Sequence, residues 1–263
     1  MQMDTYDHGV PSWVDLGTDD LPKARAFYGA LFGWDTPEGP PESGGYTVAA
    51  IGGRSVAGLA PKMYPELPTV WMTYVNVDDA DAVAAKVPAA GGQVLLAPMD
   101  VLDIGRLAIV ADPAGAAIGV WQPRLHKGAG LVNEPNTYCW SELITTDVEA
   151  AKAFYAAVFG WGSDTQGAGT EGDGGMAYTE WKVAGRSVGG MMEKPPDMPA
   201  EVPPYWGVYF AVTDADQAVE RIKELGGTVV MGPMDIEPGR FAVAVDPIGA
   251  PFNVLALKAE LAG

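Results

Sequence analysis

The stretch that decides the fold is WVDLGTDDLPKARAFYGALFGW, which runs from Trp13 to Trp34. A near copy, WSELITTDVEAAKAFYAAVFGW, runs from Trp140 to Trp161, 127 positions later. In both copies an alternating run leads through an acidic turn into apolar residues at helical spacing, and a glycine follows. The pattern is typical of a strand, a turn and a helix. Its return indicates two copies of one domain.

The duplication extends along most of the chain. The motif GRSV at 53–56 returns at 185–188, PMD at 98–100 returns at 233–235, and DPxG at 112–115 returns at 246–249. The offset drifts only in Gly- and Pro-rich stretches, where loops tolerate insertions. We expect one domain over residues 8–125, a linker with the sequence HKGAGLVNEPN over 126–136, and a second domain over 137–258.

Each half is itself doubled. A second strand-and-helix pattern follows the first, as WMTYVNVDDADAVAAKVPAAGG at 71–92 and as WGVYFAVTDADQAVERIKELGG at 206–227. Aspartates are placed to cap the four helices, and glycines are placed to end them in a left-handed conformation. These residues are Asp20, Asp79, Asp147 and Asp214, and Gly33, Gly91, Gly160 and Gly226. The pattern predicts an α+β fold of four units, each with one helix and about four strands.

The composition narrows the classes of partner. Hydrophobic residues make up 48% of the 263 residues, which is enough for substantial cores, and the net charge is −18. This charge argues against binding nucleic acid or an anionic membrane surface. The chain has one cysteine, Cys139, lacks a run long enough to span a bilayer, and begins without a signal-peptide pattern. We therefore expect a cytoplasmic protein whose partner is a small molecule. The stretch GSDTQGAGTEGDGG at 162–175 is interpreted as an exposed acidic loop.

The motifs FYGALFGW and FYAAVFGW, together with ADPAGAAIGVWQ and VDPIGAPFNVLA, resemble those of the vicinal oxygen chelate superfamily. This superfamily includes glyoxalases, bleomycin-resistance proteins and extradiol dioxygenases. The resemblance covers residues 8–258 and is nearest to a tandem-domain actinobacterial subgroup that includes proteins of antibiotic gene clusters. It implies two tandem glyoxalase-like domains. Each would consist of two βαβββ units, which form a U-shaped, mostly antiparallel sheet that cups a ligand and carries its helices outside.

Metal-dependent members of this superfamily bind their metal with His, Glu or Gln from the first strand of each unit and with a Glu late in the last strand. The matching positions here are Trp13, Met72, Gly119, Trp140, Gly207 and Asn253. None of them is a histidine or a carboxylate, and the two histidines, His8 and His126, lie outside the expected strands. We expect no metal and no other cofactor. An oxygen-ligated site using Asp15, Glu142 or Glu193 stays open as an alternative.

Strand alternation then predicts the residues that face each cup. The helix-facing side of the first strand carries Val14 and Leu16, so the residues between them face the ligand side. The first cup is expected to carry Trp13, Asp15, Tyr74, Asn76 and Trp121, and the second cup Trp140, Glu142, Tyr209 and Asn253. Aromatic rings with a few polar groups suit a flat, largely apolar guest. The alternative is that the tryptophans are ordinary core packing in cups filled by side chains.

The two carboxylates at matching positions, Asp15 and Glu142, are the candidate catalytic residues. A carboxylate that faces an apolar cup has its pKa raised and can act as a general base near neutral pH. The alternative is that each only accepts hydrogen bonds from a neighbouring strand or pairs with an arginine.

Three functions follow from these expectations. The first is a metal-free protein that binds an aromatic metabolite or antibiotic, in the manner of bleomycin-resistance proteins. The second is a metal-independent enzyme of secondary metabolism or aldehyde detoxification. The third, a metal-dependent glyoxalase or dioxygenase, is disfavoured by the missing histidines. Because four units in one chain already supply the pairing that smaller relatives obtain by dimerising, we expect a monomer rather than a homodimer.

Overall fold

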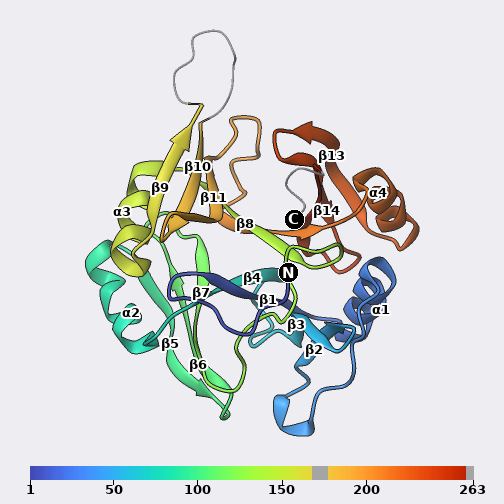
Figure 1. The fold of residues 1–263 in the computed structure, drawn as a ribbon, viewed down its shortest axis with the longest axis horizontal. Coiled ribbons are helices and arrows are strands. Elements are labelled where there is room, and N and C mark those ends of the chain that lie inside the picture. The colour runs from blue at the N-terminus through green and yellow to red at the C-terminus, as the bar shows by residue number, and fades with distance from the viewer. Residues whose placement is uncertain (168–176, 259–263) are drawn as a thin grey trace.

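The computed structural model describes residues 1–167 and 177–258, and within them the chain forms four α-helices and fifteen strands (Figure 1). The first half contains β1 (Pro11–Thr18), α1 (Leu21–Phe32), β2 (Thr47–Ile51), β3 (Arg54–Pro61), β4 (Val70–Asn76), α2 (Ala80–Lys86), β5 (Gln93–Val101), β6 (Gly105–Ala111) and β7 (Ala117–Pro123). The second half contains β8 (Tyr138–Thr145), α3 (Val148–Phe159), β9 (Gly162–Gln166), β10 (Tyr178–Val183), β11 (Arg186–Glu193), β12 (Tyr205–Ala211), α4 (Ala215–Glu224), β13 (Thr228–Ile236), β14 (Gly239–Val245) and β15 (Pro251–Leu257).

Each half forms one mixed sheet. The strand order is β2-β3-β1-β4-β7-β6-β5 in the first sheet and β13-β14-β15-β12-β8-β11-β10-β9 in the second. The first strands of the two units, β1 and β4, pair antiparallel at the centre, and β8 and β12 do the same in the second sheet. In each unit the first strand also runs parallel to the last, as β1 does with β3 and β4 with β7. The predicted α+β fold of two tandem domains, each built from two units, is confirmed.

Two local expectations need correction. The first unit has three strands rather than about four, because the segment after α1 contributes only an isolated bridge between Asp35 and Ala50. The stretch at 162–175 is not all loop, since Gly162–Gln166 forms β9 at the edge of the second sheet. Residues 168–175 of that expected loop lie outside the described residues. Both differences arise because strand formation depends on hydrogen bonds to a neighbouring strand, and the local sequence pattern does not predict that neighbour.

The predicted helix starts are confirmed. The side chains of the four aspartates accept the backbone N–H three residues on, at 3.0 Å for Asp20, 2.9 Å for Asp79, 2.9 Å for Asp147 and 3.0 Å for Asp214. Gly33 and Gly160 end α1 and α3 with positive φ angles of 70° and 74°. In the other two units the helix ends earlier, at Lys86 and Glu224.

The helices pack between the two domains, with α1 beside α4 and α2 beside α3 (Figure 1). One apolar core contains Val14 and Leu16 of β1 and Phe27 of α1, and continues into Phe210 and Phe252 of the second domain. A second core joins α3 to the strands and helix of the second unit in the same way. The opposite faces of both sheets are thereby left for the cups. None of the described helices has the length and apolar character needed to cross a bilayer.

The segment expected as a linker is packed against the first domain. The backbone N–H of Ala129 donates to Ser12 O at 2.8 Å, and that of Gly130 donates to Ser55 O at 2.8 Å. Ala129 and Val132 are only 1% and 5% exposed. The segment therefore covers one end of the first cup instead of hanging free between the domains.

Candidate functional site

A partly buried network of hydrogen bonds lies on the floor of the first cup. The indole Nε1 of Trp13 donates to Tyr46 Oη at 2.7 Å, and Tyr46 donates to Asp15 Oδ2 at 3.1 Å. Tyr74, from the neighbouring β4, donates to the other oxygen, Oδ1, at 3.1 Å. Trp13 and Asp15 alternate on β1, and Trp13 stands opposite Tyr74 in the register, so the sheet holds all three on one face. Both carboxylate oxygens thus accept from neutral phenols.

The second cup repeats this arrangement. Trp140 Nε1 donates to Tyr178 Oη at 3.0 Å, and Tyr209 donates to Glu142 Oε1 at 2.9 Å. The Tyr178 hydroxyl lies close enough to Glu142 to favour its ionised form, which opposes the effect of burial on the pKa of that acid. The structure therefore brings together Trp13, Asp15 and Tyr74 in one cup, and Trp140, Glu142 and Tyr209 in the other.

Glycines make room for the two bridging tyrosines. Gly58 stands opposite Asp15 between β3 and β1, and a Cβ there would lie 2.0 Å from Tyr46 Oη. Gly190 stands opposite Glu142 between β11 and β8, and a Cβ there would lie 1.8 Å from Tyr178 Oη. Any side chain at these positions would push the phenol away from the carboxylate.

The two carboxylates are partly buried and have no cationic partner among the described residues. Burial raises the pKa of Asp15 to about 7, although its two phenol hydrogen bonds act in the opposite direction. Burial likewise raises the pKa of Glu142. Within residues 1–167 and 177–258, no Lys, Arg or His nitrogen lies within 4.0 Å of either carboxylate. Asp15 can therefore change its charge near neutral pH, and either acid, when ionised, can stabilise a positive charge on a guest.

The remaining first-cup residues are held by the chain segments that cover the cup. Trp121 Nε1 donates to His126 O at 3.0 Å, and Asn76 Nδ2 donates to Tyr6 O at 2.8 Å. The His126 ring stands edge-on to Trp13, with 4.4 Å between ring centroids. Burial lowers the pKa of His126 to about 4, so its ring is neutral. Asn76 thus anchors the N-terminal segment, and Trp13, Tyr74 and Trp121 are all buried.

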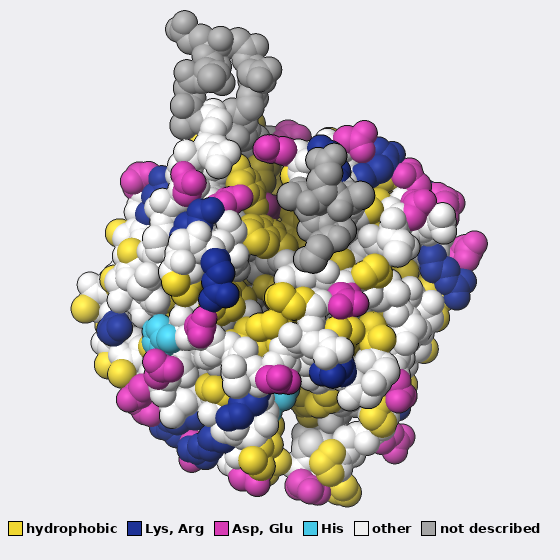
Figure 2. All heavy atoms as spheres, viewed as in Figure 1, with side chains coloured by type: hydrophobic (Ala, Val, Ile, Leu, Met, Phe, Trp, Pro, Cys, Tyr) yellow, Lys and Arg dark blue, Asp and Glu magenta, His cyan; other side chains and the backbone are white. Residues whose placement is uncertain are grey.

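The second cup is the more open of the two. Trp140 is only partly buried, whereas Trp13 is 4% exposed. The wall on β13 and β14 carries Phe241, Val243, Met231 and Met234, which the register places on the cup side. Figure 2 shows this face hollowed, with hydrophobic side chains inside. Asn253 lies at the floor beside Tyr209 and donates to Val208 O at 3.1 Å.

Sequence reasoning missed Tyr46, Tyr178 and His126. The two tyrosines carry a signal that could have revealed them, because Tyr-Thr at 46–47 returns as Tyr-Thr at 178–179, with the same offset of 132 as the GRSV motif. No comparable signal marks His126. It lies in the segment between the repeats, and only the folded path of that segment brings it to Trp13.

Many members of the superfamily that the sequence motifs resemble bind a metal in the cup. The side chains at the matching positions decide whether a metal could be held here. In the first cup, the late-strand position is Gly119, and a Cβ there would lie 2.2 Å from the Tyr74 ring. In the second cup, Gly207 faces the Asn253 amide. Across the described part of the chain, no three His, Cys, Asp or Glu side chains gather in a way that could hold a metal ion. The residues present do not fit a metal centre.

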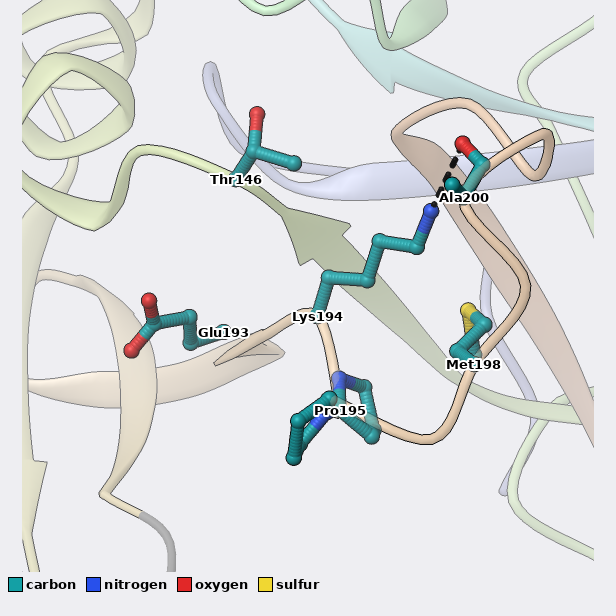
Figure 3. A pocket seen from close by; sticks show the side chains of 7 residues that line it. Thr146, Glu193, Lys194, Pro195, Met198 and Ala200 are labelled. Atoms are coloured by element: carbon teal, nitrogen blue, oxygen red, sulfur yellow. Dashed lines mark hydrogen bonds between the residues drawn. The ribbon is translucent and has the colours of Figure 1, made fainter.

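Two other hollows lie beside the start of α3, away from both cups. The smaller has a volume of about 260 Å³ and is lined by the loop that follows β11 (Figure 3). Its one lysine, Lys194, is held by that loop, because Nζ donates to Ala200 O at 3.2 Å and to Val202 O at 2.6 Å. The larger, about 520 Å³, contains Lys152, which pairs with Glu149 at 3.0 Å. Their lysines already have partners, so the cups remain the better candidates.

Comparison with known proteins shows which family this two-domain architecture belongs to. The family model described as "Glyoxalase/Bleomycin resistance protein/Dioxygenase superfamily" matches residues 10–120 and again 131–254. The chain belongs to this superfamily. The match in both halves agrees with the resemblance that the sequence motifs carry.

The chain is also similar to two named proteins along nearly its whole length. It is 45% identical to "Putative glyoxylase CFP32" of Mycobacterium bovis over 256 residues, which is 95% of each chain. It is 39% identical to "Anthracycline biosynthesis protein DnrV" of Streptomyces peucetius, with 97% of this chain and 96% of that protein covered. Both relatives therefore share its tandem length.

Among solved structures, the fold is similar to that of a Mn(II)-bound glyoxalase and of a dioxygenase. The Mn(II)-bound glyoxalase of Novosphingobium aromaticivorans matches with a TM-score of 0.62 and 18% identity, covering 96% of this chain and 84% of that one. The dioxygenase LapB of Pseudomonas sp. KL28 matches with a TM-score of 0.64 and 14% identity, covering 94% and 92%. At this identity the likeness concerns the fold alone.

Proposed function

We propose that this protein binds a flat, largely apolar small molecule in its second cup without the help of a metal. The observation that carries the proposal is the Trp140–Tyr178–Glu142–Tyr209 cluster, which faces an apolar wall at Phe241. Aromatic rings on one side, methionines on the other and a single polar pole make a surface on which a planar guest can stack.

The similarity to a protein named for anthracycline biosynthesis supports this class of guest. An anthracycline has a planar fused-ring body with polar groups at its edge, which matches a stacking surface with one carboxylate. The first cup contains the same cluster, but the ring of His126 packs against Trp13 there, so the second cup is the preferred site.

The test uses a fluorescent planar probe, anthracenylmethanol, whose anisotropy rises when it binds. We expect saturable binding to the intact protein, and we expect Trp140→Leu to weaken it about tenfold because the stacking ring is lost. The equivalent change in the first cup, Trp13→Leu, distinguishes the sites. If Trp13→Leu weakens binding and Trp140→Leu does not, the guest lies in the first cup and the assignment is wrong. If the probe does not bind at all, a planar guest is the wrong class.

A second function, metal-independent acid–base catalysis, is favoured by one observation. The raised pKa of Asp15, about 7, suits a group that takes up and releases a proton at neutral pH. A mixture of methylglyoxal and glutathione, with excess EDTA, is the probe suggested by the relative named as a glyoxylase. Turnover that survives EDTA and is lost in Asp15→Asn would support this function. Turnover that requires added metal would contradict it.

A further inference from the structure

Glu142 has no positively charged partner among the described residues, in contrast to the acid that lies nearest to it in the cup. The nearby Glu180, whose charge also acts on Tyr178, is paired with Lys182 and accepts a hydrogen bond from Ser187 at 2.8 Å. Glu142 has only phenol hydroxyls, at 2.9 Å in the case of Tyr209. Phenols stabilise an ionised carboxylate by donating to it, but they do not neutralise it.

The direction of the hydrogen bonds keeps the carboxylate an acceptor. Tyr178 accepts the Trp140 indole N–H on its oxygen, so its own proton can turn towards Glu142 and lower the pKa of that acid. Tyr209 donates from the other side. Removing a carboxylate partly from water costs free energy, and a positively charged donor offsets this cost more fully than a neutral one does. The protein supplies no such group among its described residues, so a guest is left to supply it.

Aromatic rings gather around this carboxylate. Trp140 and Tyr209 stand opposite each other in the register, and Tyr178 accepts from Trp140. Burial and the nearby charge of Glu142 together raise the pKa of Tyr205. The faces of indole and phenol rings attract cations, most strongly where water is excluded. A carboxylate within a group of such rings is the combination that recognises organic ammonium groups.

We propose that the second cup selects guests that carry a protonated amine, with Glu142 as the anionic contact and the surrounding rings as cation-binding faces. This rests on the proposed function, because the amine must be attached to the planar body that the cup stacks. A neutral analogue would stack without the ionic contact. An anionic analogue would be repelled by Glu142 and by the net charge of −18.

The experiment compares three probes that share one planar body: anthracenylmethylammonium, anthracenylmethanol and anthracene carboxylate. Anisotropy titrations are run on the intact protein at about pH 8, because burial raises the pKa of Glu142 and a higher pH favours its ionised form. We expect the ammonium probe to bind about tenfold more tightly than the alcohol and the carboxylate probe to bind least. In Glu142→Gln, the ratio between ammonium and alcohol falls to about one, while the alcohol still binds.

Glu180→Gln is the matched control, because it removes the same charge from a neighbouring position whose hydrogen-bond partners, Lys182 and Ser187, lie outside the phenol cluster. It should change the ratio less than about twofold. Equal binding of ammonium and alcohol to the wild type would overturn the inference while leaving the proposed function intact. A ratio that survives in Glu142→Gln, or that falls equally in Glu180→Gln, would also overturn it. Failure of all three probes to bind would overturn both.

Discussion

At the scale of single residues, the unusual feature is a carboxylate in each cup with neutral partners only. The native state holds Asp15 between Tyr46 and Tyr74, where its charge is opposed by burial and supported only by two phenol hydrogen bonds. A site optimised for stability alone would pair this acid or replace it. The acid therefore represents a stability cost, which is typical of functional positions.

This cost predicts a pH-dependent stability. The pKa of Asp15 is about 7 in the folded state against 3.8 ordinarily, so its proton stabilises the fold at low pH, and this contribution is lost as the pH rises through about 7. Between about pH 5 and about pH 8, the unfolding free energy of the wild type should fall relative to Asp15→Asn by about 2 to 3 kcal/mol. Urea unfolding at several pH values measures this. Parallel pH profiles for the two proteins would show that the acid is as easily ionised folded as unfolded.

At the scale of secondary-structure elements, the register of two strand pairs positions each cluster. Gly190 of β11 faces Glu142 of β8, and the space left by its missing side chain holds the Tyr178 hydroxyl. We expect Gly190→Ala to displace this phenol, to weaken binding of the planar probes at least fivefold and to cost about 1 to 3 kcal/mol of stability. The control is Gly162→Ala in β9, where the nearest atom would lie 3.6 Å from the new Cβ. Unchanged binding in Gly190→Ala would remove the Tyr178 contact from the site.

Elements fixed by local chemistry were predictable from the sequence, and those fixed by distant pairing were not. The helix starts were found because Asp147 and its equivalents cap through a hydrogen bond within one turn. The face carrying Trp140 and Glu142 was found because strands alternate. By contrast, β9 and the position of Tyr178 depend on partner strands, and His126 depends on the path of a covering segment. These contacts join residues that are far apart in the sequence, so no periodic pattern predicts them.

At the scale of the whole molecule, the two domains exchange equivalent contacts. Trp71 Nε1 donates to Tyr28 Oη at 2.9 Å, and Tyr28 donates to Asp246 Oδ2 of the other domain at 3.0 Å. The equivalent hydrogen bonds join Trp206 to Tyr155 and Tyr155 to Asp112. Here the tyrosine belongs to the second domain and the aspartate to the first. Thus the tyrosine of the FYxxxFGW motif meets the aspartate of the DPxGA motif across the domain boundary. The motifs that reveal the repeat are therefore also contacts that join its copies.

This reciprocity predicts that the chain unfolds as one unit. Tyr155 accepts from Trp206 Nε1 at 2.8 Å and donates to Asp112 Oδ2 at 3.2 Å, so Tyr155→Phe leaves two buried polar groups without their partner. We expect a loss of about 2 to 4 kcal/mol in a single urea transition, with far- and near-ultraviolet circular dichroism coinciding. Tyr64→Phe, at a tyrosine that is 50% exposed, should change stability by less than about 0.5 kcal/mol. Two separate transitions, with only one shifted by Tyr155→Phe, would mean that each domain is stable without the other. The shared cores around α1 and α3 argue for the single transition, because neither helix can bury its apolar surface within its own half.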